Sequence, residues 1–400
     1  MKMYKKGMKD MKKLLVVLMA VLCAFSLCAC SGSKEPTSGT ATVNPVIKIG
    51  ASGPLTGGAA VYGLCVKNAA EIAIEEINAL DTIQFEFNMQ DDEADGEKAT
   101  TAYGVLTDWG MQASLFTVTS GSGAAVAPLY DEDGIFAITP SGSSTALVYS
   151  DTTNYPNNFQ MCFTDPNQGI ASADYLAENF ADETVAVIYK NDDVYSAGVY
   201  DKFAAEAAAV GVNPVYVGTF DDSNASDFNV QLTKAQEAGA TLVYLPIYYQ
   251  PAALILQQAD QMGYAPVFFG IDGMDGVLDQ LGDQAALANG VYLLTPFAAD
   301  ATDEKTVNFV KKYQEKTGEI PNQFGADAYD CVYAIYQALM NAGYDGTWST
   351  EEITTALTAQ FTSMTFDGIT GLSMTWGANG EVSKAPKAVI IQDGVYVSAK

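Results

Sequence analysis

From residue 46 onward, short runs typical of β-strands alternate with longer segments whose apolar residues recur at helical spacing. The first three are VIKIGAS at 46–52, GLCVKNAAEIAIEEINAL at 63–80 and IQFEFNMQ at 83–90. A helix at 96–110, a strand at 113–119, a helix at 124–134 and a strand at 135–139 are expected to follow. This alternation predicts a parallel sheet whose strands are joined by right-handed crossover helices.

The pattern then starts again. A helix at 167–181 precedes the strand TVAVIYK at 184–190, and further helices and strands alternate up to GVYLLTPF at 290–297. Two more helices are expected at 304–318 and 324–343, and the remaining residues resemble short strands with Gly and Asn-Gly turns. The sequence therefore predicts an α/β protein with two doubly wound parallel-sheet units.

Two serine- and glycine-rich stretches follow strands of the first unit. They are TVTSGSGAA at 117–125 and ITPSGSSTA at 138–146. In open parallel sheets, ligands bind beyond the carboxyl ends of the strands, where both stretches are expected to lie. Neither stretch completes a phosphate-binding loop or a GxSxG nucleophile elbow. The hydroxyl and N–H groups of these turns remain free to bind another anion, such as a carboxylate.

Two residue types are absent from the whole sequence. There is no histidine, and all 20 basic residues are lysines. A Ser-His-Asp or Cys-His relay is therefore impossible, and the commonest transition-metal ligand is missing. No guanidinium can grip an anion, so hydroxyls, backbone N–H groups, helix N-termini or lysine must do so. The formal net charge of -28 argues against nucleic acid as a partner.

The first residues are typical of a secretory signal. Six lysines precede the apolar run 14–27, which is too short for a comfortable membrane span. LCAC at 27–30 resembles a bacterial lipobox, which implies cleavage of a signal peptide at 1–29 and lipid attachment to Cys30. The segment 30–45, rich in Ser, Gly, Thr and Pro, is expected to be a flexible tether. The alternative is an ordinary signal peptide that happens to contain cysteine.

Three cysteines remain in the body of the chain, Cys65, Cys162 and Cys331. They allow at most one disulfide and show no CxxC spacing, so neither a disulfide framework nor a zinc site is indicated. Each is expected to be a small apolar packing residue. No metal and no cofactor are expected.

Four segments, in order, resemble the binding proteins of ABC importers for leucine, isoleucine and valine. They are GPLTGGAAVYG at 53–63, YDEDGIFAITPSGSS at 130–144, FGIDG at 269–273 and FGADAYDCVYAI at 324–335. The resemblance covers residues 46–400 and implies a type I periplasmic-binding-protein fold, with two lobes joined by three crossovers. It places 46–164 and 296–384 in the first lobe and 165–295 and 385–400 in the second.

The resemblance also implies a ligand site. Ser120 matches the residue that holds the α-carboxylate, with Ser141 and Ser143 adding further contacts, and Asp272 matches the acid that binds the ammonium group. Aromatic residues of the family's site match Tyr62, Tyr195, Tyr248 and Phe324. Asp275 and Tyr249 are the alternatives to Asp272 and Tyr248. An aspartate at 272, where the best-known member of the family has the longer glutamate, and a poorly matched side-chain pocket leave the ligand open.

The resulting hypothesis is an extracytoplasmic substrate-binding protein without enzymatic activity. It would capture a small hydrophobic or branched-chain amino acid between two closing lobes and deliver it to the subunits of an ABC permease. A monomer, lipid-anchored through Cys30 on the outer face of the cytoplasmic membrane, is expected. The alternatives are a binding protein for another small carboxylate, such as an aromatic acid, and a ligand-sensing module for a receptor. A secreted hydrolase is the alternative from the enzyme class.

Overall fold

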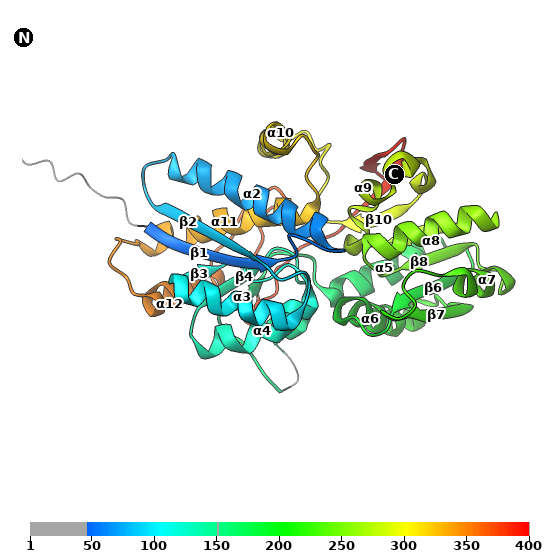
Figure 1. The fold of residues 1–400 in the computed structure, drawn as a ribbon, viewed down its shortest axis with the longest axis horizontal. Coiled ribbons are helices and arrows are strands. Elements are labelled where there is room, and N and C mark those ends of the chain that lie inside the picture. The colour runs from blue at the N-terminus through cyan, green and yellow to red at the C-terminus, as the bar shows by residue number, and fades with distance from the viewer. Residues whose placement is uncertain (1–45, 150–151, 400) are drawn as a thin grey trace, which may run out of the picture. The chain divides into compact units, whose positions relative to one another are not determined.

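The structure, a computed structural model, describes residues 46–149 and 152–399. The expected signal peptide and tether lie outside these residues, as does Cys30. Two separate sheets organise the described residues, one of five strands and one of seven (Figure 1). No helix within the described residues is both long and apolar enough to cross a membrane.

The first sheet is parallel throughout, with the strand order β2-β1-β3-β4-β5. Its strands are β1 (Val46–Gly53), β2 (Gln84–Asp91), β3 (Ala113–Ser114), β4 (Phe136–Thr139) and β5 (Asn158–Gln160). The chain adds β2 on one side of β1 and β3 on the other, and this reversal of strand order opens a crevice at the carboxyl edge of a doubly wound sheet.

Helices cover both faces of this sheet (Figure 1). On one face, α3 (Gly96–Trp109) packs against α4 (Ser120–Glu132). On the other, α2 (Ala60–Asn78) packs against α11 (Gln323–Ala342), next to α12 (Thr350–Phe361). The ring of Phe361 packs against Phe136 and Phe159 of the sheet, so the late helices belong to this first core. α10 (Glu304–Thr317) contacts α2.

The second sheet has the order β12-β11-β10-β9-β8-β6-β7. Its parallel strands are β6 (Val185–Lys190), β7 (Tyr216–Phe220), β8 (Leu242–Leu245), β9 (Val267–Gly270) and β10 (Tyr292–Thr295). The chain returns at its end to add β11 (Lys387–Gln392) and β12 (Val395–Ser398), both antiparallel. The hairpin turn between them carries Asp393 and Gly394 at positive φ, as a tight two-residue turn requires.

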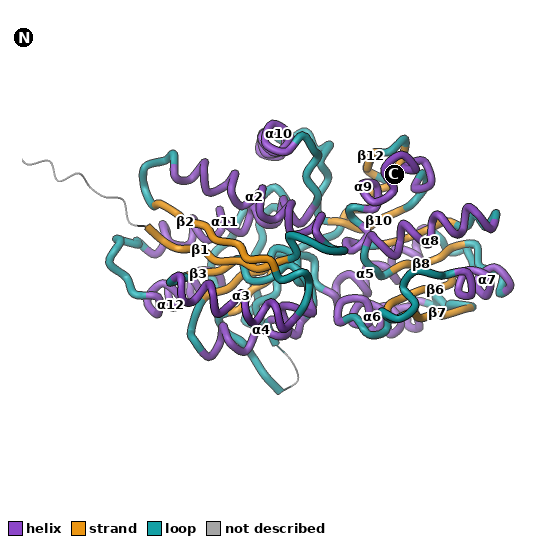
Figure 2. Tube along the Cα trace, in the orientation of Figure 1, coloured by secondary structure: helices purple, strands orange, loops and turns teal. Residues whose placement is uncertain are grey.

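The second sheet is also covered on both faces. α5 (Asp165–Asn179) and α6 (Val194–Val210) form one layer, and α7 (Asn229–Glu237) and α8 (Tyr249–Met262) form the other (Figures 1 and 2). The short elements are η1 (Thr145–Leu147), η2 (Asp272–Met274), α9 (Val277–Leu281) and η3 (Gly282–Ala288).

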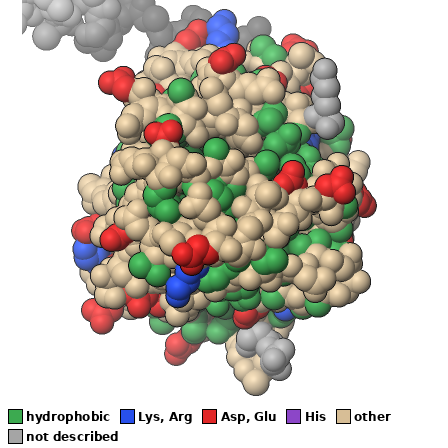
Figure 3. Space-filling model, turned by 90° about the vertical axis from the view of Figure 1, so that its right-hand side faces the viewer, with side chains coloured by type: hydrophobic (Ala, Val, Ile, Leu, Met, Phe, Trp, Pro, Cys, Tyr) green, Lys and Arg blue, Asp and Glu red, His purple; other side chains and the backbone are tan. Residues whose placement is uncertain are grey.

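Acidic side chains are spread over the face drawn in Figure 3, where lysines are sparse, as the net charge predicts.

The structure differs from the expected elements in several places, among them the unexpected helix α12, and two of the differences bear on the ligand-binding residues. The strand expected at 113–119 is shorter: its ladder covers Ala113–Ser114, and hydrogen bonds to β1 continue as far as the carbonyl of Phe116, which has a positive φ. The helix expected from residue 124 begins at Ser120, so the first serine-glycine stretch forms the first turn of α4 rather than a loop before it. These two changes place the hydroxyl of Ser120 at a helix N-terminus.

Candidate ligand-binding site

All eight side chains expected to contact a ligand line one cavity at the carboxyl ends of the strands. Tyr62 (α2), Ser120 (α4), Ser141 and Ser143 (after β4) and Phe324 (α11) come from elements packed on the first sheet. Those from elements of the second sheet are Tyr195, Tyr248 and Asp272. The remaining lining residues are Val118, Thr119 and Gly273.

The two serine-glycine stretches form one hydrogen-bonded unit. The Ser120 hydroxyl accepts the N–H of Ser144 at 3.2 Å, which ties the start of α4 to the second stretch. The Thr139 hydroxyl accepts the N–H groups of Ser141 and Gly142 and donates to the Thr117 carbonyl at 2.8 Å. The backbone of the second stretch is therefore fixed, and its serine hydroxyls are presented from a rigid support.

The N-terminus of α4 also faces this cavity. Its N-cap residue, Thr119, makes no side-chain capping bond, so the first N–H groups of the helix are not satisfied by that hydroxyl. Uncapped N–H groups and the positive end of the helix dipole favour an anion. With the hydroxyls of Ser120, Ser141 and Ser143 beside them, this side of the cavity can hold a carboxylate without arginine.

Asp272 lies on the other side of the cavity, 2% exposed, as the first residue of η2, two residues after the end of β9. Its Oδ1 accepts the Tyr195 hydroxyl at 2.7 Å, and its Oδ2 accepts the side-chain N–H of Gln168 at 2.7 Å. Burial raises the pKa of Asp272 to about 7, and the hydrogen bond from Tyr195 opposes that rise. A buried carboxylate with no lysine among the lining residues is suited to bind a cationic group such as an ammonium.

Aromatic rings fill the space between the two sides. Tyr195 stacks on Tyr248 with ring centroids 5.1 Å apart, and Tyr62 meets Phe324 edge-on at 4.7 Å. The Tyr62 hydroxyl donates to the carbonyl of Gly273, which links α2 to the segment after β9. These rings form an apolar wall suited to a hydrocarbon side chain.

The alternative residues lie elsewhere. Asp275 does not line this cavity but a second one. Tyr249 packs edge-on against Tyr62, 4.9 Å between centroids, and does not line the cavity, whereas Tyr248 does. The structure thus places Asp272 and Tyr248, rather than their sequence neighbours, in the candidate site.

Three residues near the site were not expected from the sequence. Gln168 is fully buried and donates to both Asp272 and the carbonyl of Phe163, so it fixes the orientation of the carboxylate. Burial is the main cause that raises the pKa of the Tyr248 hydroxyl, and the nearby Asp193 and Asp165 raise it further. Burial also raises the pKa of Asp165.

The cavity between these side chains is small, about 10 Å³, which is close to the volume that one water molecule needs. An amino acid therefore fits only after the aromatic side chains, or the elements that carry them, move apart. Larger cavities lie elsewhere in the described residues, including one of about 560 Å³. We assign the small cavity as the candidate site because of its converging polar groups rather than its volume.

The three cysteines of the described residues are free and buried. Burial raises the pKa of the Cys65 thiol to about 12 and raises those of Cys162 and Cys331 well above their ordinary value. Cys162 lies next to the second serine-glycine stretch, with its sulfur 3.4 Å from the Gly142 carbonyl oxygen. Protonated thiols of this kind act as packing groups rather than nucleophiles.

Comparison with known proteins gives a consistent result. A family model described as periplasmic binding protein matches residues 46–392. A leucine-, isoleucine-, valine-, threonine- and alanine-binding protein of Pseudomonas aeruginosa is 28% identical over 302 residues, 74% of this chain and 79% of the relative.

Solved structures agree. A leucine-binding protein of Thermotoga maritima has a TM-score of 0.78 at 25% identity, covering 88% of this chain and 98% of its own. A branched-chain amino acid transporter substrate-binding protein of Streptococcus pneumoniae, in complex with isoleucine, has a TM-score of 0.76 at 26% identity, covering 88% of this chain and 100% of its own. These similarities confirm the resemblance and the two-sheet fold class predicted from the sequence.

The same fold also binds other carboxylates. A solute-binding protein of an R. palustris ABC transporter, in complex with benzoate, has a TM-score of 0.78 over 88% of this chain and 95% of its own. Its 19% identity to this chain makes the similarity one of fold alone. The choice between an amino acid and an aromatic acid therefore depends on the side chains of the site.

Proposed function

This chain belongs to the periplasmic binding protein family, and on that premise we propose that it is the substrate-binding protein of an ABC importer. Its ligand is a small hydrophobic or branched-chain amino acid, which it delivers to the permease subunits in the membrane. The observation that carries the proposal is the cavity in which a buried carboxylate, Asp272, opposes the serine hydroxyls of two strand ends.

The chemistry of a free amino acid matches this arrangement. Its carboxylate needs hydrogen-bond donors, which Ser120, Ser141 and Ser143 supply together with the N-terminus of α4. Its ammonium group needs an acid, which Asp272 supplies. Leaving either charge unpaired in a closed site would cost several kcal/mol, so both sides of the cavity contribute to selection.

The division into lobes is part of the proposal. Residues 46–164 and 296–384 contain the first sheet with its helices, and 165–295 and 385–400 contain the second sheet. Ligand contacts contributed by both lobes stabilise the closed arrangement over the open one, and the permease recognises the closed form. No chemical step is involved, because the site binds and releases its ligand unchanged.

Localisation follows from the family at a coarse level, since its importer members act outside the cytoplasm. We infer further that residues 1–29 form a signal peptide, that Cys30 carries the lipid anchor and that 30–45 tethers a monomer to the membrane. The support for this is the lysine-rich start, the apolar run and the LCAC motif of the sequence. Mass spectrometry of the protein purified from membranes tests it, because diacylglycerol on Cys30 adds a defined mass.

A second candidate ligand is an aromatic acid, favoured by the rings of Tyr62, Tyr195, Tyr248 and Phe324 around the cavity. Asp272 argues against it, because an acid without an ammonium group would leave the aspartate buried and unpaired.

The first prediction separates the two ligands. Calorimetric titration of the protein, unfolded and refolded to strip bound ligand, should show saturable binding of leucine, isoleucine or valine. A micromolar dissociation constant corresponds to about 8 kcal/mol. Asp272→Asn should weaken binding by about a hundredfold, because the ammonium group loses its charged partner.

The matched control is Asp283→Asn, an exposed aspartate on η3 outside the cavity, which should leave binding unchanged. Binding of benzoate but of no amino acid, with no effect of Asp272→Asn, would refute the amino-acid assignment.

A further inference from the structure

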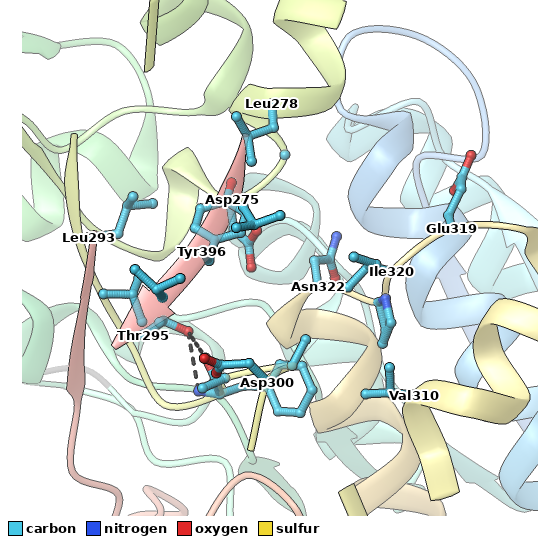
Figure 4. A pocket seen from close by; sticks show the side chains of 18 of the residues that line it. Asp275, Leu278, Leu293, Thr295, Asp300, Val310, Glu319, Ile320, Asn322 and Tyr396 are labelled. Atoms are coloured by element: carbon cyan, nitrogen blue, oxygen red, sulfur yellow. Dashed lines mark hydrogen bonds between the residues drawn. The ribbon is translucent and has the colours of Figure 1, made fainter. Parts of the chain in front are cut away.

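A second cavity, of about 560 Å³, lies apart from the candidate ligand-binding site (Figure 4). Side chains of α9 and of strands β10 to β12 line it, together with side chains of α10 and of the segment 319–322. Sites for small molecules have volumes of roughly 300–1,000 Å³. The cavity therefore has the size of a ligand site, although nothing in the proposed function uses it.

Most of its lining is apolar. Leu278, Leu293, Phe297, Val310 and Ile320 line it from four separate segments of the chain. Ile320 is 58% exposed, so part of this apolar surface faces water. Covering it with a hydrocarbon chain of a ligand would remove that surface from water, which is favourable.

The charged groups of the cavity are all of one sign. Asp275, Asp279, Asp300 and Glu319 line it, and no lysine does. None of the four forms an ion pair with a lysine in the described part of the chain. Acids that share a cavity without a counter-charge raise its affinity for cations and repel anions.

Two polar groups lie together among the apolar side chains. Figure 4 shows Asp275 and Tyr396 next to each other between Leu278 and Asp300, with Asn322 on the opposite side. The Oδ2 of Asp275 accepts the backbone N–H of Gln323 at 3.1 Å, which holds the carboxylate in place. The Tyr396 hydroxyl oxygen is buried beside the Asp275 carboxylate, and its interaction with that carboxylate lowers the pKa of Asp275 against the larger, opposite effect of burial. A carboxylate oxygen and a hydroxyl oxygen both have lone pairs with which to accept a donor placed here.

We propose that this cavity is a second binding site, for a small molecule that combines a protonated primary amine with a short apolar chain. The ammonium group donates to the Asp275 carboxylate and the Tyr396 hydroxyl, and the apolar chain covers Leu278, Leu293 and Ile320. The site is distinct from the amino-acid site, because the two cavities share no lining residue.

The test uses three probes of equal length and different charge, titrated calorimetrically into the protein purified after expression of the full chain. Hexylamine should bind saturably with one site per chain, hexanol about tenfold more weakly, and hexanoate not measurably. Equal binding of hexylamine and hexanol would overturn the proposal, because the acids would then play no part. Absence of saturable hexylamine binding would overturn it outright.

Two variants locate the binding. Asp275→Asn should weaken hexylamine binding about tenfold through loss of the charged partner, and Ala299→Trp should abolish it by filling the cavity with an indole ring. Glu351→Gln, an exposed acid at the start of α12, is the matched control and should bind hexylamine normally. Thermal unfolding of each variant shows whether it folds. If one of the two test variants does not fold, hexylamine binding by the other tests the location of the site.

The same variants also show whether hexylamine binds in the amino-acid site instead of the second cavity. Asp272→Asn should weaken hexylamine binding less than Asp275→Asn does, because Asp272 does not line this cavity. Loss of hexylamine binding in Asp272→Asn, with normal binding in Asp275→Asn and Ala299→Trp, would place the amine in the amino-acid site and refute a second site.

Discussion

Asp272 is a carboxylate in a position that water hardly reaches. Its two oxygens accept hydrogen bonds from Tyr195 and Gln168, yet burial outweighs these bonds and raises its pKa to about 7. Its charge therefore changes within the physiological pH range, which is unusual for an aspartate. An ammonium group binds the ionised form and competes with the proton.

The second prediction follows from this competition. Affinity for the amino acid should fall about tenfold between pH 8 and pH 6, because most Asp272 carboxylates are ionised at pH 8 and protonated at pH 6. Calorimetric titration with leucine at pH 8, 7 and 6 measures it. Asp272→Asn should show weak affinity that does not vary with pH. Unchanged affinity of the unmodified protein across this range would contradict the assignment of Asp272 as the ammonium partner.

Among single residues, site residues that follow a strand could be predicted from the sequence, whereas a supporting residue inside a helix could not. Asp272 and Ser120 were expected from the family resemblance, and their position after apolar runs, at the edge where parallel sheets bind ligands, agrees with that assignment. Gln168 was not expected, because it lies inside a helix and its partner Asp272 is 104 positions away in the sequence. No local pattern marks a glutamine whose importance comes only from the folded contact.

The short element η2 depends on a glycine that has no room for a side chain. A Cβ on Gly273 would lie 2.7 Å from the Tyr195 ring and 2.8 Å from the Ile247 carbonyl oxygen. The Gly273 N–H donates to the Tyr195 hydroxyl, and its carbonyl accepts from Tyr62. The absence of a side chain at Gly273 therefore allows Tyr195 and Tyr62, which come from different helices, to hydrogen-bond to the same residue.

The third prediction compares two glycines. Gly273→Ala should lower the free energy of unfolding by about 1–3 kcal/mol, since the ring and the carbonyl must move, and should also weaken amino-acid binding. Gly104→Ala, in the middle of α3 with no atom within 4 Å of the added Cβ, should raise it by about 0.5–1 kcal/mol. Urea unfolding measures both. A neutral Gly273→Ala would show that this contact is not tight.

Among the elements, periodicity predicted the long helices better than the irregular segments. α2 and α11 have sustained apolar spacing and lie close to the expected positions. The region 272–288 forms η2, α9 and η3, and none of these was expected, because Gly273, Gly276 and Gly282 interrupt any apolar period. Short turns of this kind are held by contacts with neighbouring elements, which a single sequence does not contain.

For the whole molecule, several buried acids with raised pKa values make the folded state more stable at low pH than at high pH. Burial raises the pKa of Asp92 and of Asp275 to about 6 and that of Asp272 to about 7. Each folded-state pKa lies above the value of an unfolded aspartate, so the folded state binds more protons between these values. The stability they contribute is complete below about pH 4 and is lost as the pH rises through 6 and 7.

The fourth prediction is that the protein melts a few degrees higher at pH 5 than at pH 8. Acids whose pKa is lowered, such as Glu76 and Asp303, are ionised in both states over this range and do not oppose the trend. Differential scanning calorimetry at constant ionic strength measures it. Asp92→Asn should reduce the difference, and a higher melting temperature at pH 8 would contradict the prediction.

The arrangement into two sheets followed from the strand–helix alternation, but the assignment of the late helices did not. Nothing in the periodicity of α10 to α12 indicates that they pack on the first sheet, although they follow the second in the sequence. The contact of Phe361 with Phe136 joins residues more than 200 positions apart. Only the family resemblance predicted that return of the chain.

The three buried thiols have a practical consequence. Cys65, Cys162 and Cys331 are protonated and buried. A maleimide dye would therefore not react with any cysteine in the described part of the chain. A single cysteine introduced at Val194, 41% exposed and next to Tyr195, would then carry the only label. The fluorescence of that label would report each capture and release at the neighbouring cavity, which makes the chain a scaffold for an optical amino-acid sensor.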